Sequence, residues 1–125
     1  MLFEKKIISF DFDNTLYDQF IAFPRWKLIE QLHVFSREHK IIIATARENS
    51  ERFEVENFIA KYKLPIQDIY FTNQSLKGSL LKCLGVIKHF DDCPYQLKSA
   101  KDNGIESIDV LNYVGSKRIP SFQIV

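Results

Sequence analysis

Short apolar, β-branched segments alternate with helical segments along the chain, and this alternation constrains the fold more than any other feature. The strand candidates are residues Lys6–Phe12, Ile41–Ala44, Ile66–Phe71, Val86–Phe90 and Ile105–Val110. Apolar stripes at helical spacing, with Pro or Gly near their ends, predict helices over Pro24–His39, Ser50–Tyr62, Ser75–Leu84 and Pro94–Asn103. Strands that alternate with helices form parallel sheets covered on both faces. We therefore expect a three-layer, Rossmann-like α/β fold with a mainly parallel five-stranded sheet.

Composition and charge narrow the function classes. The chain has 125 residues, and we expect residues 1–125 to form a single domain. Its 17 basic and 16 acidic residues give a net charge of +1, without the basic excess of a dedicated nucleic-acid binder. A nucleic-acid partner is thus not indicated by charge, although a local basic patch stays open. Two cysteines do not make a disulfide framework, and no run approaches the ~18 apolar residues of a membrane span. We expect a cytoplasmic protein without a membrane partner.

Polar residues follow four of the predicted strands at the point where each strand ends. They are Asp11 and Asp13, Thr45 and Arg47, Thr72 and Asn73, and Asp91 and Asp92. In parallel α/β sheets, chemistry lies beyond the carboxyl ends of the strands. Several carboxylates in one crevice repel each other unless a cation is bound. Oxygen ligands without clustered His or Cys favour Mg²⁺, and the nearby basic and hydroxyl groups suggest a phosphate ligand.

Three of these strand ends resemble motifs of the haloacid dehalogenase-like (HAD) hydrolases. The segment Asp11-Phe12-Asp13-Asn14-Thr15-Leu16 resembles motif I. The segment Ile41-Ile42-Ile43-Ala44-Thr45-Ala46-Arg47 resembles motif II, and His89-Phe90-Asp91-Asp92-Cys93-Pro94 resembles motif IV. The resemblance covers nearly the whole chain, and three motifs on three strand ends are far more specific than motif I alone. It implies a Mg²⁺-dependent phosphomonoester hydrolase.

The resemblance also implies a role for each matching residue. Asp11 would attack phosphorus and form an aspartyl-phosphate, and Asp13 would be the general acid and then the general base. Asp11, Asp92 and the backbone carbonyl of Asp13 would hold Mg²⁺, while Asp91 would act through bound water or a hydrogen bond. Thr45, Ala46, Arg47 and a motif III lysine would bind the phosphate.

Three assignments stay open at the level of sequence. The resemblance favours Lys77 as the motif III lysine, because it would open the helix before the motif IV strand, and Lys82 is its rival. Arg47 contacts the substrate phosphate or leaving group, or instead pairs with Glu48 or Glu51. In the aromatic stretch that the family folds into a hairpin flap, Phe23 and Trp26 would pack the first helix onto the sheet. The functional alternative is that Tyr17 or Phe20 stacks on a substrate ring.

The motif spacing leaves no room for a cap domain, because only 32 residues separate Asp13 from Thr45. Capless relatives act on large substrates such as phosphoproteins or nucleic-acid ends, or form oligomers in which a neighbour closes the site. The arginine after Thr45 is broadly like the phosphatase half of polynucleotide kinase-phosphatases. We expect a phosphorylated small molecule or macromolecular end as substrate, with a homo-oligomer as an option. The rival functions are a module that binds a phosphorylated ligand or partner without turnover, and a phosphotransferase. A receiver domain is disfavoured, because its phosphoacceptor follows the third strand.

Overall fold

The computed structural model describes residues 4–112 and contains one five-stranded parallel sheet. Its strands are β1 (Lys6–Phe10), β4 (His39–Thr45), β5 (Asp68–Phe71), β6 (Val86–Asp91) and β7 (Glu106–Asp109). Their order across the sheet is β5-β4-β1-β6-β7, and all four neighbouring pairs are parallel. The order reverses next to β1, which therefore lies at the topological switch point of the sheet. The predicted α/β fold and its five strands are confirmed.

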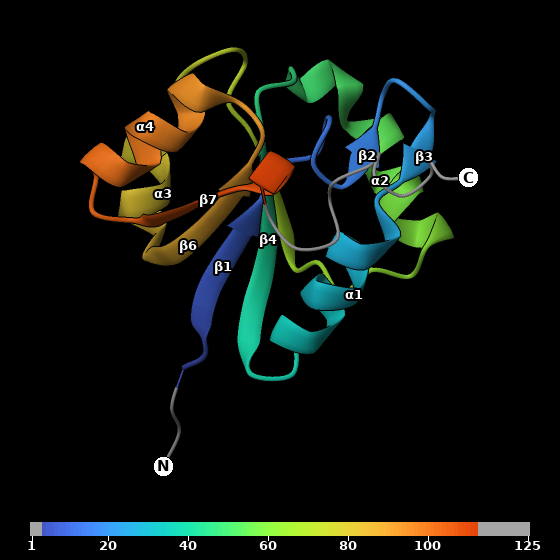
Figure 1. Cartoon of the computed structure of the whole chain (residues 1–125), viewed down its shortest axis with the longest axis horizontal. Helices are drawn as coiled ribbons and strands as arrows, with labels where there is room; N and C mark the ends of the chain where they lie inside the picture. The colour runs from blue at the N-terminus through green and yellow to red at the C-terminus, as the bar shows by residue number, and fades with distance from the viewer. Residues whose placement is uncertain (1–3, 113–125) are drawn as a thin grey trace.

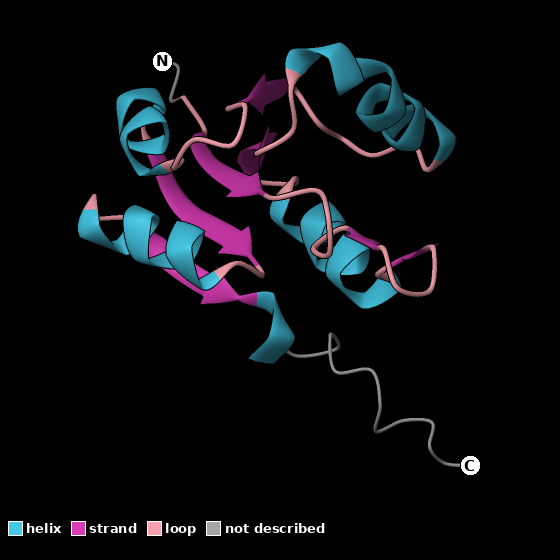
Figure 2. Cartoon of the chain, turned by 90° about the horizontal axis from the view of Figure 1, so that it is seen from above, coloured by secondary structure: helices cyan, strands magenta, loops and turns pink. Residues whose placement is uncertain are grey.

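Four α-helices complete the three layers. They are α1 (Trp26–Phe35), α2 (Arg52–Lys61), α3 (Gly78–Leu84) and α4 (Pro94–Asp102). The first two cover one face of the sheet, and the last two cover the other (Figures 1 and 2). Two short 3₁₀ turns, η1 (Asn49–Glu51) and η2 (Val110–Asn112), precede α2 and follow β7. Among residues 4–112, no helix is both long and apolar enough to cross a bilayer.

Side-chain alternation along β4 divides the core into two clusters. Ile41 and Ile43 belong to the cluster under α1 and α2, whereas Ile42 and Ala44 belong to the cluster under α3 and α4. All four side chains are buried, as expected for a central strand with helices on both faces. The continuous apolar run in the sequence is thus explained by burial on both sides.

The connection between β1 and β4 holds a small hairpin and α1. Strands β2 (Tyr17–Asp18) and β3 (Phe23–Pro24) pair antiparallel and form the flap. The first helix begins at Trp26 rather than at the predicted Pro24, because Pro24 is paired with Tyr17 across the hairpin. Within residues 4–112, neither this connection nor the one from β4 to α3 contains a cap-like insertion. The capless architecture is confirmed.

Two glycines determine how α3 is placed. Gly85 ends α3 in the left-handed conformation, with φ of 81°, as the sequence predicts. At the other end, the amide of Gly78 donates to Ser99 Oγ of α4 at 3.0 Å. A Cβ at position 78 would collide with the backbone oxygen of Ser99, so only glycine permits this approach. The close contact between α3 and α4 fixes the position of the preceding residue, Lys77. The apolar composition of the tail after Leu111 predicts that it packs, but residues 113–125 lie outside the described part of the chain.

Candidate active site

Two aspartates lie side by side where β1 and β6 end. The amide of Asp11 donates to the carbonyl of Phe90 at 2.8 Å, which extends the ladder between the two strands to the site. Asp91 is the last residue of β6, and Asp92 follows it. The side chains of Asp11 and Asp91 are buried, and that of Asp92 is half-buried. The parallel pairing of adjacent strands therefore brings together carboxylates that are 80 residues apart in the sequence.

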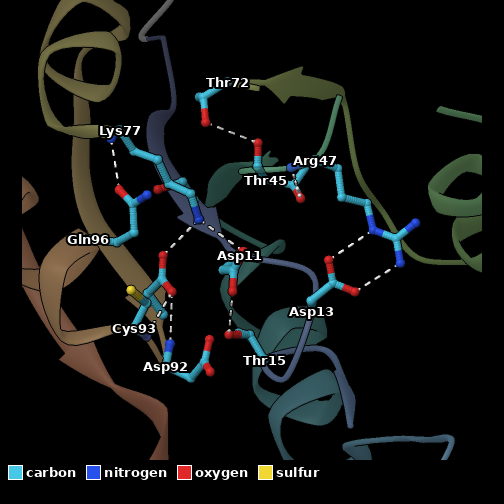
Figure 3. Close-up of polar contacts among 12 residues, drawn as sticks. Asp11, Asp13, Thr15, Thr45, Arg47, Thr72, Lys77, Asp92, Cys93 and Gln96 are labelled. Atoms are coloured by element: carbon cyan, nitrogen blue, oxygen red, sulfur yellow. Dashed lines mark hydrogen bonds and ion pairs between the residues drawn. The ribbon is translucent and has the colours of Figure 1, made fainter. Parts of the chain in front are cut away.

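Lys77 joins these two carboxylates. Its Nζ lies 2.9 Å from Asp11 Oδ1 and 2.8 Å from Asp91 Oδ2 (Figure 3). The lysine side chain is only 1% exposed, whereas Lys82 is exposed on α3. The structure therefore brings Lys77, and not Lys82, to the predicted site. The predicted helix from Ser75 begins only at Gly78, and the irregular segment before it aims Lys77 inward.

The charges in this cluster do not balance. Asp11, Asp91 and Asp92 face the single ammonium of Lys77. Burial raises the pKa of Asp11 well above its usual range; Lys77 opposes this increase, and the negative charge of Asp91 adds to it. Burial also raises the pKa of Asp92, again with a contribution from Asp91. For Lys77, burial acts against the charged form, but Asp11 and Asp91 outweigh it and raise the pKa of the ammonium. The cluster is short of positive charge.

Asp91 is held by four donors. Its Oδ1 accepts the amides of Asp92 at 2.9 Å and Cys93 at 3.1 Å. Its Oδ2 lies 2.8 Å from both Lys77 Nζ and His89 Nε2. Burial opposes ionisation here, but the hydrogen bond from His89 and the charge of Lys77 hold the pKa of Asp91 below its usual range. Asp91 is therefore a fixed anion in the site.

These residues fit an oxygen-ligated divalent cation. One carboxylate oxygen from each of Asp11, Asp91 and Asp92 lies within 4.8 Å of the others. The donor set contains oxygen alone and carries excess negative charge, which suits Mg²⁺ better than zinc. Because Asp91 already accepts four hydrogen bonds, Asp11 and Asp92 are better placed to bind the ion directly. The carboxylate of Asp13 lies outside this group of three.

Asp13 instead forms a two-point ion pair with Arg47. Arg47 Nε lies 2.8 Å from Asp13 Oδ2, and Nη2 lies 2.9 Å from Oδ1 (Figure 3). Gln19 of the flap also donates to Asp13 Oδ1 at 3.1 Å. The hydrogen bonds to Asp13 are the largest cause that raises the pKa of Arg47. Of the acidic partners considered from sequence, Glu51 lies 3.9 Å from Arg47, and Glu48 instead caps η1.

Two further contacts of Arg47 were not predicted. Its Nη1 bonds Glu54 of α2. The Arg47 guanidinium lies over the ring of Phe12, 5.3 Å from its centroid. Arg47 is thereby held between the site and α2.

A hollow of about 380 Å³ contains most of the predicted site residues. Its lining includes Asp11, Asp13, Ala46, Lys77, Asp91 and Asp92. Thr45 is buried at the end of β4, and its hydroxyl accepts the amide of Arg47 at 3.2 Å, but Thr45 is not among the lining residues. Thr72 and Asn73 also lie outside the lining. The amide of Asn73 donates to the carbonyl of Arg47 at 3.1 Å and so helps to shape the loop.

Phe23 and Trp26, the two aromatic residues expected to pack α1 onto the sheet, are both largely exposed. Phe23 is 60% exposed and does not pack α1 onto the sheet. Phe23 and Pro24 form the two-residue strand β3, and of these two residues Pro24 is the buried one. Trp26 is half exposed but packs edge-on against Tyr62, with ring centroids 5.3 Å apart. Phe20 is 86% exposed at the hairpin turn.

Three residues that contact the site were not assigned from sequence. Thr15 Oγ1 donates to Asp11 Oδ2 at 3.1 Å. Gln96 Oε1 accepts the amide of Lys77 at 2.8 Å. His89 is fully buried between Ser9 Oγ at 2.6 Å and Asp91 Oδ2 at 2.8 Å. His89 lies two residues before Asp91 on the same strand, and this shared face is the signal that could have identified it. Gln96 had no such signal, because its contact depends on the packing of α3 against α4.

The fold is similar to that of chains in two solved structures. One is the structure of the Pnkp1/Rnl/Hen1 RNA repair complex, with a TM-score of 0.67 and 21% identity. The other is a structure of the Pnkp1/Rnl/Hen1 complex, with a TM-score of 0.66 and 20% identity. Each match covers 84% of this chain but only 42% and 45% of the matched chains. Identities this low show a shared fold. No protein-family model matches the chain, and no curated protein matches it.

Proposed function

We propose that residues 4–112 form the catalytic unit of a HAD-like, Mg²⁺-dependent phosphomonoester hydrolase, and that the chain acts as a single domain. The observation that carries this proposal is the buried Lys77 ammonium, which is bonded to both Asp11 and Asp91 beside Asp92. A buried nucleophile, a cation and a divalent-metal donor set at one sheet edge are the elements that phosphoryl transfer requires.

In this proposal, Asp11 is the nucleophile. Its Oδ2 or Oδ1 forms a bond to phosphorus while the bond from phosphorus to the leaving oxygen breaks, which leaves an aspartyl-phosphate. Asp13 gives its proton to the leaving oxygen. Asp13 then takes a proton from water, whose oxygen attacks phosphorus and releases Asp11 and inorganic phosphate. When bound by Asp11 and Asp92, Mg²⁺ neutralises charge on the phosphoryl oxygens.

Lys77 and Arg47 supply positive charge to the phosphoryl group. Lys77 screens the buried Asp11 carboxylate from the incoming phosphate, because its Nζ lies 2.9 Å from Oδ1. Arg47 now occupies both oxygens of Asp13. For Asp13 to reach the leaving oxygen, Arg47 must release it, and a phosphate dianion is a competing bidentate ligand for the guanidinium. Thr45 and Ala46 lie at the base of the same loop.

Two observations favour a nucleic-acid end as the phosphorylated group. The matched chains belong to an RNA repair complex, and the site has no cap-like insertion within the described residues that would close over a small molecule. The net charge of +1 gives no independent support. A homo-oligomer in which a neighbouring copy covers the open site remains part of this proposal for small substrates.

Binding without turnover is the second candidate function, and the ion pair between Asp13 and Arg47 favours it. In the structure, the Arg47 guanidinium bonds both carboxylate oxygens of Asp13, so the proposed acid faces Arg47. Asp11 and Asp92 would still hold a cation in such a module. A phosphotransferase would share the aspartyl-phosphate and differ only in its acceptor.

A phosphate-release panel separates these functions. It contains mononucleotides, sugar phosphates, phosphopeptides and 3′-phosphorylated oligonucleotides, each with Mg²⁺ and with EDTA. We expect Mg²⁺-dependent release that is lost in Asp11→Asn and retained in Asp109→Asn, a matched carboxylate at the end of β7. Release from no member, by a folded protein that binds Mg²⁺, would contradict the hydrolase proposal and favour the binding module.

A further inference from the structure

A second hollow lies beside the candidate active site and shares no lining residue with the hollow that contains Asp11 and Lys77. It has a volume of about 390 Å³, within the size range of ligand sites. Tyr17 and Ala22 of the flap line one side, and α2 lines the other. We call this space the flap slot. None of the hydrolytic steps proposed above uses it.

The wall of the flap slot is aromatic. Phe12, Tyr17, Phe58 and Tyr62 all line it. Their rings support one another: the Phe12 and Tyr17 centroids lie 6.0 Å apart and nearly parallel, and the Phe58 and Tyr62 centroids lie 4.8 Å apart. Aromatic surfaces of this kind bind flat rings by stacking or by edge contacts. Because Phe12 and Phe58 are buried in the core, the wall is rigid.

The remaining lining is polar and carries both donors and acceptors. Asn57, Glu54 and Lys61 of α2 contribute an amide, a carboxylate and an ammonium. Glu54 is bonded to Arg47, and the exposed amide of Asn57 and ammonium of Lys61 can bond the edge of a heteroaromatic ring, which an aliphatic ligand does not offer. The flap slot is thus suited to a planar aromatic ring that carries hydrogen-bonding atoms at its edge.

Arg47 connects the flap slot to the reaction. Its side chain lines the slot, while its Nε and Nη2 bond Asp13 in the neighbouring hollow. In the proposed mechanism, Asp13 faces the leaving oxygen, so the leaving group departs on the Asp13 side. A leaving group that starts there continues past Arg47 into the slot.

We infer that the flap slot binds the nucleobase of a nucleotide leaving group. This inference rests on the proposed phosphatase function for its biological meaning, but base binding itself does not require catalysis. The base lies against Tyr17 and Tyr62, and its edge meets Asn57. Stacking on aromatic residues tolerates every base, so the slot selects nucleotides over sugar phosphates with little preference among bases.

The test fills the slot from an exposed helical position. Asn57→Trp places an indole in the slot, and Asn57 is exposed, so the fold is expected to tolerate it. The matched control is Ala60→Trp, three residues later on α2, where the exposed alanine lines a separate hollow with Arg52 and Ile66. Adenosine and cytidine, which carry no phosphate, are the probes, with ribose as the control that lacks a base. Saturation-transfer NMR reports contacts to base protons.

We expect contacts to adenine and cytosine protons in the wild type and in Ala60→Trp, and their loss in Asn57→Trp. In turnover, the ratio of kcat/KM for a 3′-mononucleotide to that for glycerol phosphate falls roughly tenfold in Asn57→Trp and is unchanged in Ala60→Trp. Absence of nucleoside binding, or equal binding in both variants, overturns the inference. Base binding without any phosphate release would support the flap slot as a base-binding site and would contradict the proposed hydrolase function.

Discussion

Arg47 and Asp13 form a bidentate ion pair, with Nε 2.8 Å from Oδ2 and Nη2 2.9 Å from Oδ1. Because Asp13 follows β1 and Arg47 follows β4, this pair bridges the loops of two adjacent strands. It also ties the proposed general acid to the residue that lines the flap slot. Under the proposed function, substrate phosphate and Asp13 would compete for one guanidinium, and substrate entry would be coupled to release of the acid.

Replacement of Arg47 by alanine tests this coupling. We expect kcat/KM for the best phosphomonoester to fall roughly a hundredfold, the cost of losing one preorganised donor at a charged transition state. Arg52→Ala is the matched control, because Arg52 pairs with the exposed Glu56 on α2. Steady-state kinetics provide the comparison. Equal losses in both variants would show that Arg47 acts only through general surface charge.

Lys77→Met is expected to destabilise the fold as well as to abolish activity. It leaves the buried Asp11 and Asp91 carboxylates without their shared cation, a change that costs about 3 to 5 kcal/mol in other buried pairs. Lys82→Met, on the exposed side of α3, should change stability by less than about 0.5 kcal/mol. Urea unfolding in EDTA measures both. A stable Lys77→Met protein would mean that the buried carboxylates tolerate isolation.

Asp11→Asn should remove activity yet increase stability at neutral pH. The pKa of Asp11 is raised by burial, so the folded state takes up a proton before the unfolded chain does as pH falls. Ionised Asp11 therefore costs stability at high pH, and this cost disappears as pH falls through the raised pKa toward 3.8. We expect Asp11→Asn to unfold at higher urea than the wild type at pH 7.5 in EDTA. The gap should close on acidification, and a gap that widens would contradict the assigned shift.

Mg²⁺ should stabilise the wild type by binding the folded state alone. At a hundredfold excess over the dissociation constant, one site contributes about 2.7 kcal/mol. Asp92→Asn should lose most of this increase, whereas Asp102→Asn, which removes an exposed carboxylate paired with Lys98 on α4, should retain it. Thermal unfolding with and without Mg²⁺ gives the comparison. The same Mg²⁺ shift in both variants would place the ion elsewhere.

The grouping of polar side chains at the strand ends was predictable from sequence, because it depends on which residues directly follow each strand. The apolar runs before Asp11, Thr45 and Asp91 specify buried parallel strands, and parallel strands present their carboxyl ends at one edge. Asp11 and Asp91 therefore meet as expected. The contact between His89 and Asp91 could also have been predicted, because the two residues lie on the same face of one strand.

Contacts that depend on packing between distant segments were not predictable. The resemblance favoured Lys77 over Lys82, but the burial of Lys77 involves the close approach of α3 to α4 at Gly78 and Ser99, which the sequence did not indicate. Arg47 has several acidic residues nearby and bonds both Asp13 and Glu54. Its contact with Asp13 depends on the pairing of β1 with β4. The outward orientation of Phe23 likewise depends on Pro24 being the inward residue of the flap.

The most direct test of the account is to trap the phosphorylated enzyme. Wild-type protein turning over its best substrate with Mg²⁺ is quenched in acid and treated with borohydride, which reduces an aspartyl-phosphate to homoserine. Peptide mass spectrometry then locates the change, and we expect homoserine at position 11 with substrate and none at position 11 when substrate is left out. Homoserine at any other position, or phosphate release that persists in Asp11→Asn, would contradict it.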